Sequence, residues 1–250
     1  MSTMLIGGLQ KLTLIDYPGK IACTVFCAGC SFRCPWCYNA GLVLPEKIKV
    51  QPRISEKEFF AFLKKKKGLL EGCVLGGGEP TINPELVNFC KKIKAMNYLI
   101  KLDTNGSNPE MIKKLIAQKL VDYVALDIKA PKEKYLKVIG LKNQVGALGT
   151  KSNFWEEKII ANIEESIKIL KQSEIDSEFR TTVVPTLINK SDILEIAKWI
   201  GPAKKYYLQE FRANGTVSLE FAKKRPYPRK YLIEVQKTIS PFFEVCQIRG

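Results

Sequence analysis

The chain has 250 residues, of which 46% are hydrophobic and 10% aromatic, so it can build one substantial core. It contains no histidine, which excludes Ser–His and Cys–His nucleophiles, histidine general bases and histidine-ligated zinc. The net charge of +15 suits a nucleic-acid or acidic protein partner, or simply a lysine-rich solvated surface, and no stretch approaches the ~20 apolar residues of a membrane span.

Cysteine usage indicates the compartment. Five of the eight cysteines fall within residues 23–37, a grouping that suits a metal site in a reducing cytoplasm better than a secreted disulfide framework. The N-terminus has neither the basic region nor the long apolar region of a signal peptide. We therefore expect a cytoplasmic protein, in which Cys73, Cys90 and Cys246 are buried thiols.

Apolar strand-like runs alternate with helix-period segments along the chain. The predicted strands are 21–26, 72–75, 98–102, 123–127, 178–184 and 206–209. The predicted helices are 55–67, 84–96, 109–118, 155–171, 190–200 and 229–238. The first has a capping box from Ser55 to Glu58, the second starts at Pro84 after Asn83, and Leu86, Phe89, Cys90 and Ile93 should face the core. Six β-α units predict a parallel sheet with right-handed crossovers, and therefore a partial (β/α)6 TIM-like barrel of the α/β class.

This core should be a single domain over residues 21–240. Residues 1–20 form an N-terminal extension that covers a sheet edge or the bottom of the barrel, and residues 241–250 form a C-terminal tail. Residues 130–154 are a long insertion, which contacts substrate or is only a surface excursion.

The most informative motif follows the first predicted strand. Cys30-Ser-Phe-Arg-Cys34-Pro-Trp-Cys37 places three cysteines in a loop at C-x3-C-x2-C spacing. Three thiolates cannot close a four-ligand metal centre, so either a fourth residue such as Cys27 joins them or one metal position stays open for chemistry. Cys23, Cys27 and Cys30 repeat the spacing, but Cys23 lies within the strand, which favours the loop register.

The other unusual loops also follow strands, at the end where such barrels carry their chemistry. They are residues 76–80, 103–106, 127–131, 184–185 and 209–211. The three glycines 76–78 leave the main chain bare, and a carbonyl there or the Glu79 carboxylate could hold an ammonium group. Asp103 and Asp127 end adjacent strands, where their carboxylates suit a hard cation or merely cap loop amides.

Cys-x3-Cys-x-aromatic-Cys, with Trp36 as the aromatic residue, resembles the signature of the radical S-adenosylmethionine (radical SAM) superfamily. Residues 77–80, Gly-Gly-Glu-Pro, resemble the methionine-amine motif of that superfamily. More closely, the chain resembles the glycyl-radical-enzyme activating enzymes, and among them the anaerobic ribonucleoside-triphosphate reductase activating proteins. The passages that carry this resemblance are 14–19, 26–39, 103–106, 126–129 and 180–185.

The resemblance implies a [4Fe–4S] cluster on Cys30, Cys34 and Cys37. It implies S-adenosylmethionine on the fourth iron, bound by Trp36, Tyr38, Gly77, Gly78, Glu79, Pro80, Asn105, Lys129, Arg180 and Gln209. It also implies a monovalent cation on Asp103, Thr104, Asp127 and the Ile128 carbonyl. Tyr38 stands where activating enzymes commonly have histidine, and Gln209 or Glu210 could replace a second histidine that this chain lacks.

The implied activity is reductive cleavage of S-adenosylmethionine to a 5′-deoxyadenosyl radical, which installs a glycyl radical on a partner enzyme. The implied partners are anaerobic ribonucleotide reductase and a flavodoxin or ferredoxin electron donor, with no membrane. Two alternatives stay open. A radical SAM enzyme could act on RNA or a small molecule, which the charge of +15 motivates. A non-catalytic binding protein could use a closed zinc or iron–sulfur site, for which Cys27 would be the fourth ligand.

Overall fold

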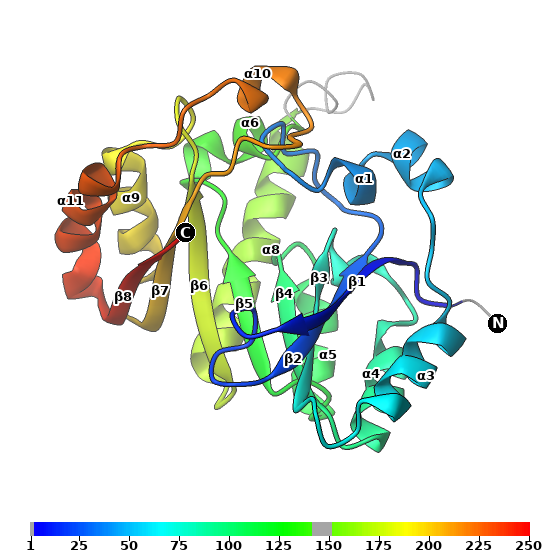
Figure 1. The fold of residues 1–250 in the computed structure, drawn as a ribbon. Coiled ribbons are helices and arrows are strands. Elements are labelled where there is room, and N and C mark those ends of the chain that lie inside the picture. Colours follow the sequence, from blue (N-terminus) through cyan, green and yellow to red (C-terminus); the bar gives the residue numbers. More distant parts are fainter. Residues whose placement is uncertain (1–2, 142–151) are drawn as a thin grey trace.

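The computed structural model describes residues 3–141 and 152–250, whose strands form one sheet in the order β1-β2-β3-β4-β5-β6-β7-β8 (Figure 1). β1 (Ile6–Thr13) pairs antiparallel with β2 (Ala22–Cys27), and every later neighbour pairs in parallel. The later strands are β3 (Gly72–Gly77), β4 (Leu99–Thr104), β5 (Tyr123–Asp127), β6 (Asp176–Val183), β7 (Ala203–Glu210) and β8 (Phe243–Arg249). Because β1 and β8 lie at opposite ends of this order, the barrel is open.

The structure confirms the α/β class and the open parallel barrel, and it corrects the number of strands. The six predicted strands are β2 to β7, each placed to within about three residues. Two further strands were not predicted. β1 lies within the N-terminal extension along the edge of the sheet, and β8 occupies most of the expected C-terminal tail.

Helices connect the strands and cover the outer face of the sheet. They are α1 (Ala40–Val43), α2 (Pro45–Val50), α3 (Glu56–Lys65), α4 (Leu86–Ala95), α5 (Pro109–Ala117), α6 (Tyr135–Val138), α8 (Ser152–Gln172), α9 (Lys190–Ile200), α10 (Leu219–Ala222) and α11 (Arg229–Ile239). Short 3-10 turns are η1 (Pro80–Ile82), η2 (Lys132–Lys134) and η3 (Ser240–Phe242). The six predicted helices are α3, α4, α5, α8, α9 and α11, and Figure 1 shows α3 and α4 at one end of the sheet and α9 and α11 at the other.

Local signals explain where two of these helices begin. The Ser55 hydroxyl accepts from the Glu58 amide, and the Glu58 carboxylate accepts from the Ser55 amide, so the predicted capping box is confirmed. The predicted start of the next helix is wrong. Asn83 accepts from the Glu85 amide at 2.9 Å in a turn of its own, and α4 begins two residues after Pro84.

The two faces of the sheet have different chemistry because side chains alternate along each strand. The outer face packs against the helices, and the predicted core residues of α4 are all buried there, namely Leu86, Phe89, Cys90 and Ile93. The inner face is mostly polar. Tyr17, from the N-terminal extension, packs with Ala22, Val74 and Tyr123 in a small second core.

Part of the predicted insertion is structured as η2 and α6, whereas residues 142–151 lie outside the described residues. Within the described ranges, no helix combines the length and the apolar character that crossing a membrane requires.

Candidate active site

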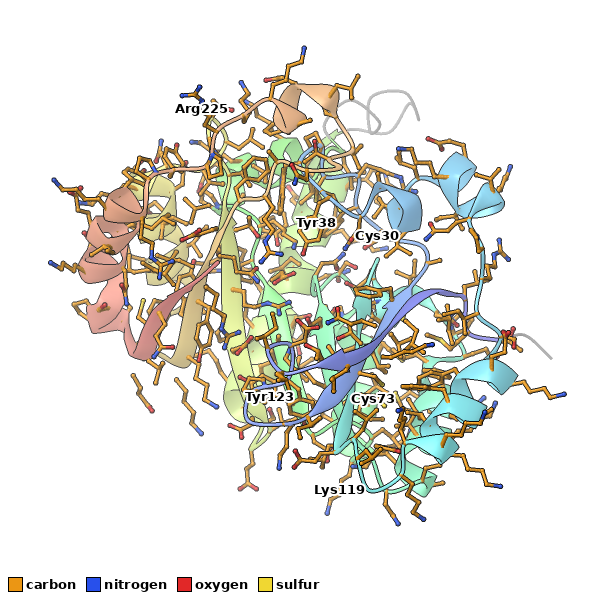
Figure 2. All side chains as sticks on the ribbon, viewed as in Figure 1. Cys30, Tyr38, Cys73, Lys119, Tyr123 and Arg225 are labelled. Carbon is orange, nitrogen blue, oxygen red and sulfur yellow. The ribbon has the colours of Figure 1, made fainter. Side chains whose placement is uncertain are left out.

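The loops after the strands meet around a cavity of about 230 Å³. Fourteen of the predicted site residues line it, namely Cys30, Cys34, Trp36, Cys37, Tyr38, Gly77, Gly78, Asp103, Thr104, Asn105, Asp127, Lys129, Arg180 and Gln209. Figure 2 shows Cys30 and Tyr38 together near the upper ends of the strands, far from Lys119 at the lower edge. Residues as far apart in the sequence as Cys30 and Gln209 are therefore brought to one place.

The three loop cysteines are free thiols on the wall of this cavity. Burial raises the pKa of Cys30 to about 11 and also raises the pKa of Cys34 and Cys37. The Lys129 ammonium opposes the rise at all three. The Phe32 amide donates to the Cys30 sulfur at 3.4 Å. Lys129, which follows β5, therefore supplies positive charge, and the loop itself supplies an N–H donor, where thiolates would bind a metal.

Backbone contacts from remote segments hold the cysteine loop. The Trp36 indole donates to the Val138 carbonyl at 3.0 Å, and the Arg33 amide donates to the Ile139 carbonyl at 2.9 Å. From the other side, the Val217 amide donates to the Cys37 carbonyl at 2.9 Å. The loop is thus fixed by α6 and by the segment that precedes α10, although it contains no regular secondary structure.

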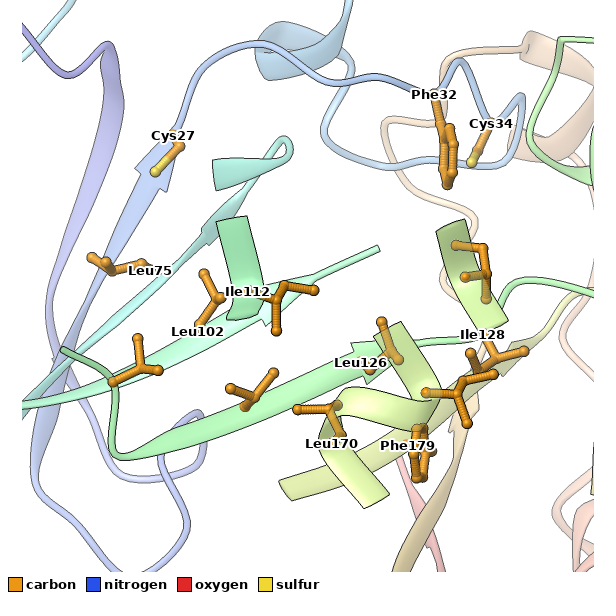
Figure 3. Close-up of a cluster of buried hydrophobic side chains, with 14 of the residues drawn as sticks. Cys27, Phe32, Cys34, Leu75, Leu102, Ile112, Leu126, Ile128, Leu170 and Phe179 are labelled. Carbon is orange, nitrogen blue, oxygen red and sulfur yellow. The ribbon is translucent and has the colours of Figure 1, made fainter. Parts of the chain in front are cut away.

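Cys27 does not join the three. It is the last residue of β2 and is buried against the helices, and it does not line the cavity. Figure 3 shows Cys27 on β2 above Leu75, well apart from Cys34, which lies beside Phe32. In the described part of the chain, no three Cys, Asp or Glu side chains converge as ligands of a single metal ion. A closed zinc site that includes Cys27 has no support from this arrangement.

The glycine loop after β3 packs directly against the cysteine loop. The Gly78 amide donates to the Cys27 carbonyl and the Glu79 amide donates to the Gly29 carbonyl, both at 2.8 Å. A Cβ on Gly78 would lie 1.9 Å from the Gly29 oxygen, so the contact requires glycine. The Asn39 amide group donates to the Gly77 carbonyl at 3.2 Å, which ties the two loops again.

Glu79 is placed differently from what its predicted role requires. Its side chain is 1% exposed and does not line the cavity. Burial raises its pKa, and hydrogen bonds from Thr81, Thr104 and the Asn105 amide oppose this rise. In this structure Glu79 fixes the loop that carries Asn105, and Pro80 is likewise buried and does not line the cavity.

The wall of the same cavity carries a buried charge network. Arg180 donates to Asp127 at 2.7 Å and to Asp103 at 3.1 Å, and Lys129 donates to the second Asp127 oxygen at 2.9 Å. Burial alone would raise the pKa of Asp127, but Arg180 and Lys129 hold it well below its usual range. Lys129 also lies 5.3 Å from the centre of the Trp36 ring. Two cationic side chains are therefore fixed on the wall of the cavity that the thiols line.

A second chamber of about 540 Å³ adjoins the first. The two share six lining residues, namely Asp16, Tyr38, Asp103, Arg180, Thr182 and Gln209. Tyr38, 55% exposed, and Gln209 thus stand between the chambers, and Glu210 lines only the outer one. The outer chamber also reaches Ile248 of β8, so the two form one cleft that extends toward the last strand.

Five cavity residues were not predicted. They are Asp16, Phe32, Asn39, Val43 and Thr182. Thr182 could have been found from its position, since it stands two residues after Arg180 on the same face of β6. Asp16 comes from the extension before the barrel, and nothing in its local sequence indicates that it reaches the cavity.

The donor set fits a group that needs three thiolates and leaves one metal position free. Three cysteines line one cavity, whereas Cys23, Cys27, Cys73 and Cys90 are fully or almost fully buried elsewhere. An iron–sulfur cluster is larger than one ion, so its ligands need not converge on a point. The bare Gly77–Gly78 main chain and the Asn105 side chain border the same space.

Comparison with known proteins agrees with this geometry. The model of the radical SAM superfamily matches residues 24–200. A protein of Methanocaldococcus jannaschii named "Putative glycyl-radical enzyme activating enzyme MJ1227" is 30% identical over 249 residues, which cover 98% of this chain and 95% of that protein. The pyruvate formate-lyase-activating enzyme of Listeria monocytogenes is 30% identical over 149 residues, covering 55% of this chain and 58% of that enzyme.

Solved structures share the fold at low identity. QueE from Escherichia coli aligns with a TM-score of 0.53 and 14% identity over 98% of this chain and 94% of its own. Streptococcus suis SuiB bound to its precursor peptide SuiA aligns with a TM-score of 0.61 and 12% identity. That alignment covers 88% of this chain but 46% of the SuiB chain. These likenesses concern the architecture alone.

Proposed function

The chain belongs to the radical SAM superfamily, and we propose that it is an activating enzyme that installs a glycyl radical on a partner enzyme. The superfamily's cofactors are a [4Fe–4S] cluster and S-adenosylmethionine. The observation that carries the proposal is the presence of three thiols on the wall of one cavity, bordered by bare main chain and by two fixed cations. The full-length similarity to a protein named as an activating enzyme supports the choice of reaction.

Each group on the cavity wall has a defined task in this proposal. Cys30, Cys34 and Cys37 would hold the cluster, and Lys129 would offset the negative charge of the thiolates. The cofactors, when bound, supply the one-electron cleavage of the S-adenosylmethionine sulfonium that yields a hydrogen-abstracting radical. The protein positions the reacting groups and excludes water, as the burial of Cys34 and Trp36 favours.

The remaining cofactor-binding assignments follow the lining of the cavity. Trp36 and Tyr38 would lie near the adenine, and the Gly77–Gly78 main chain would hold the amino group. Lys129 and Arg180 would approach the carboxylate, while Asn105 and Gln209 supply further polar contacts. Glu79 and Pro80 would act indirectly, by holding the loop.

The outer chamber would receive the partner's glycine-bearing segment. Its contact with the inner chamber at Tyr38 and Gln209 would let a substrate atom approach the cofactor without opening the barrel. Within the broader proposal, anaerobic ribonucleotide reductase is the partner we favour, and a flavodoxin or ferredoxin is the electron donor. A cytoplasmic setting suits eight free thiols and a reduced cluster.

The test is anaerobic and begins without a partner. The protein is reconstituted with iron and sulfide and reduced, and S-adenosylmethionine is added. We expect an electron paramagnetic signal of the reduced cluster that shifts with S-adenosylmethionine, together with 5′-deoxyadenosine. Cys34→Ala should lose both cluster and product, whereas Cys246→Ala, a matched change outside the cavity, should keep both. Retention by Cys34→Ala would overturn the ligand assignment.

The partner is tested next. Purified anaerobic ribonucleotide reductase is added to the reduced enzyme with either donor, and the glycyl radical is measured by its paramagnetic signal. A partner variant with alanine at the radical glycine is the control. Product formation without any partner radical would leave the radical SAM assignment in place and reject this partner.

A further inference from the structure

The predicted monovalent-cation site is already filled by side chains of this protein. Asp103 accepts from Lys101 through one oxygen and from Arg180 at 3.1 Å through the other. Asp127 accepts from Arg180 at 2.7 Å and from Lys129 at 2.9 Å, again through different oxygens. Each of the four carboxylate oxygens therefore already has a cationic N–H donor.

The other two predicted ligands are engaged as well. The Thr104 hydroxyl donates to Glu79 at 2.7 Å, and the Ile128 carbonyl accepts from the Thr181 hydroxyl at 2.8 Å. Ile128 does not line the cavity. A soluble cation would have to displace the cationic donors of Asp103 and Asp127 before it could reach six-oxygen coordination.

The net charge of this side-chain network also argues against a bound soluble cation. Three cations, Lys101, Lys129 and Arg180, contact two carboxylates, so this network carries one excess positive charge. Including Glu178, which lies 3.9 Å from Arg180, and Arg249, which pairs with Glu178, adds one charge of each sign and leaves the excess unchanged. Another soluble cation would increase a repulsion that burial leaves poorly screened.

Lys101 is the lysine that pairs with Asp103. It stands two positions before Asp103, so both side chains point to the inner face of β4. The lysine is 1% exposed, and lysine is rarely buried to this extent without a partner. Its ammonium group contacts Asp103 and lies 5.9 Å from the centre of the Tyr123 ring.

We propose that the Lys101 ammonium takes the place of a bound monovalent cation, so that this protein binds its cofactor without potassium or sodium. Lys101 is a positioning residue. By neutralising one oxygen of Asp103, it leaves the other oxygen to orient Arg180 at the cavity wall. The inference rests on the proposed function only in taking S-adenosylmethionine as the ligand.

The experiment measures S-adenosylmethionine affinity of the reconstituted protein by titration calorimetry. The buffers contain potassium, sodium or choline chloride at equal ionic strength. We expect affinities that agree within about twofold, because Lys101 already supplies the positive charge beside Asp103. Ionic strength and screening are the same in the three buffers and therefore add no difference. A gain of roughly tenfold or more in potassium or sodium over choline, about 1.4 kcal/mol, would overturn the proposal.

Two variants separate this role from a merely structural one. Lys101→Met should weaken binding in choline, and potassium should restore part of the affinity by occupying the vacated place beside Asp103. Lys101→Arg, which keeps the charge, should remain insensitive to potassium. If Lys101→Met folds and binds equally well in choline, Lys101 has no such role and the proposal is rejected.

A second measurement covers failure of the proposed function itself. If S-adenosylmethionine does not bind in any buffer, the function is wrong, and the cation question is then answered on the apo-protein. Thallium(I) NMR, with thallium as a probe for potassium, should show no saturable site. Thermal unfolding should show no increase in melting temperature that is specific to potassium. A saturable site lost in Asp103→Asn would overturn the proposal independently of S-adenosylmethionine.

Discussion

Gly78 is the residue at which two functional loops touch. Alanine there would place its Cβ 1.9 Å from the Gly29 oxygen and 3.0 Å from the Cys27 oxygen, both main-chain atoms that cannot rotate away. We expect Gly78→Ala to lower the free energy of unfolding by about 1–3 kcal/mol, in the range of overpacking, and to reduce iron bound after reconstitution. Denaturant unfolding and an iron assay measure the two effects.

Gly68→Ala is the matched control for that variant. Gly68 has φ +82°, and a Cβ at this position would have no atom within 4 Å, so alanine there costs only backbone strain of about 1–2 kcal/mol. It should lose stability but keep its iron. Equal iron binding by both variants would show that the Gly78 contact does not shape the cysteine loop.

The contribution of Asp127 to the stability of the fold should depend on pH. Its pKa is lowered in the folded protein by Arg180 and Lys129, so its ionised form stabilises the fold above the unfolded pKa of about 4. That contribution is lost as the pH falls below about 4 toward the folded value. We expect Asp127→Asn to cost about 3 kcal/mol at pH 7, because it leaves buried cations underpaired, and to cost less at pH 3.5.

The measurement is urea unfolding of the apo-protein between pH 7 and pH 3.5. Asp176→Asn, which removes an exposed ion pair with Lys205, should change stability by less than about 1 kcal/mol at every pH. A cost of Asp127→Asn that stays constant or grows toward low pH would contradict the paired, ionised carboxylate.

Single residues also show what sequence could and could not predict about the site. The cysteines and the strand-end aspartates were predictable because spacing and strand direction bring them to one end of a parallel sheet. The orientation of Glu79 was not, since it depends on three partners from Thr81 to Asn105 that form only in the folded loop. Lys101 could have been found from its position, as Thr182 could, since it stands two residues before Asp103 on the same face of β4.

At the scale of elements, β8 illustrates a different limit. Polar and apolar residues alternate only weakly along 243–249, so their sequence predicts a tail and not a strand. None of their side chains is fully buried in the structure. What fixes the strand is a remote partner. Arg249 donates twice to the buried Glu178 of β6, at 2.6 and 2.9 Å, and lies over the Tyr207 ring of β7.

Removing Arg249 should therefore cost more than removing a surface arginine. Arg249→Leu leaves Glu178 with the Tyr123 hydroxyl at 2.7 Å and a distant Arg180, and we expect a loss of about 3 kcal/mol in unfolding free energy. Arg229→Leu, which breaks the exposed pair with Glu210, should cost less than about 1 kcal/mol.

Glu178→Gln combined with Arg249→Leu gives the decisive comparison. The double variant removes the uncompensated charge, so it should recover part of the stability that Arg249→Leu loses. If the two single effects simply add, the Glu178–Arg249 pair does not anchor β8.

The central β-α units were predictable because each is long enough to show its period. Strong strand runs and helices of nine residues or more were placed to within a few residues. The four-residue helices α1, α6 and α10 span about one turn, too few residues for a period to appear. β1 contains Gly7 and Gly8, which weaken a strand signal that depends on side chains.

At the scale of the whole molecule, the charge of +15 must be reconciled with the location of the site. The densest run of cations, Lys64–Lys67, begins in the last turn of α3 and precedes the N-terminal end of β3. The cavity lies at the opposite end of the strands, with Gly77 and Gly78 on its wall. Figure 1 shows the same separation, with α3 at the lower right and α10 at the top. Nucleic acid held by this run alone would therefore contact the end of the barrel that is remote from the cysteines.

The distance between the lysine run and the cavity leads to a prediction about how tightly and how specifically the protein binds RNA. We expect tRNA to bind only non-specifically, with a dissociation constant of about 10⁻⁴–10⁻⁶ M at physiological salt that weakens steeply as salt rises. Replacing Lys64, Lys65 and Lys67 by glutamine should reduce that binding and leave 5′-deoxyadenosine formation unchanged. Filter binding across a salt series and product assays with and without tRNA measure both. Tight binding that resists salt, together with tRNA-dependent product formation, would instead favour an RNA substrate, because specific contacts near the cavity would then outweigh the dispersed surface charge.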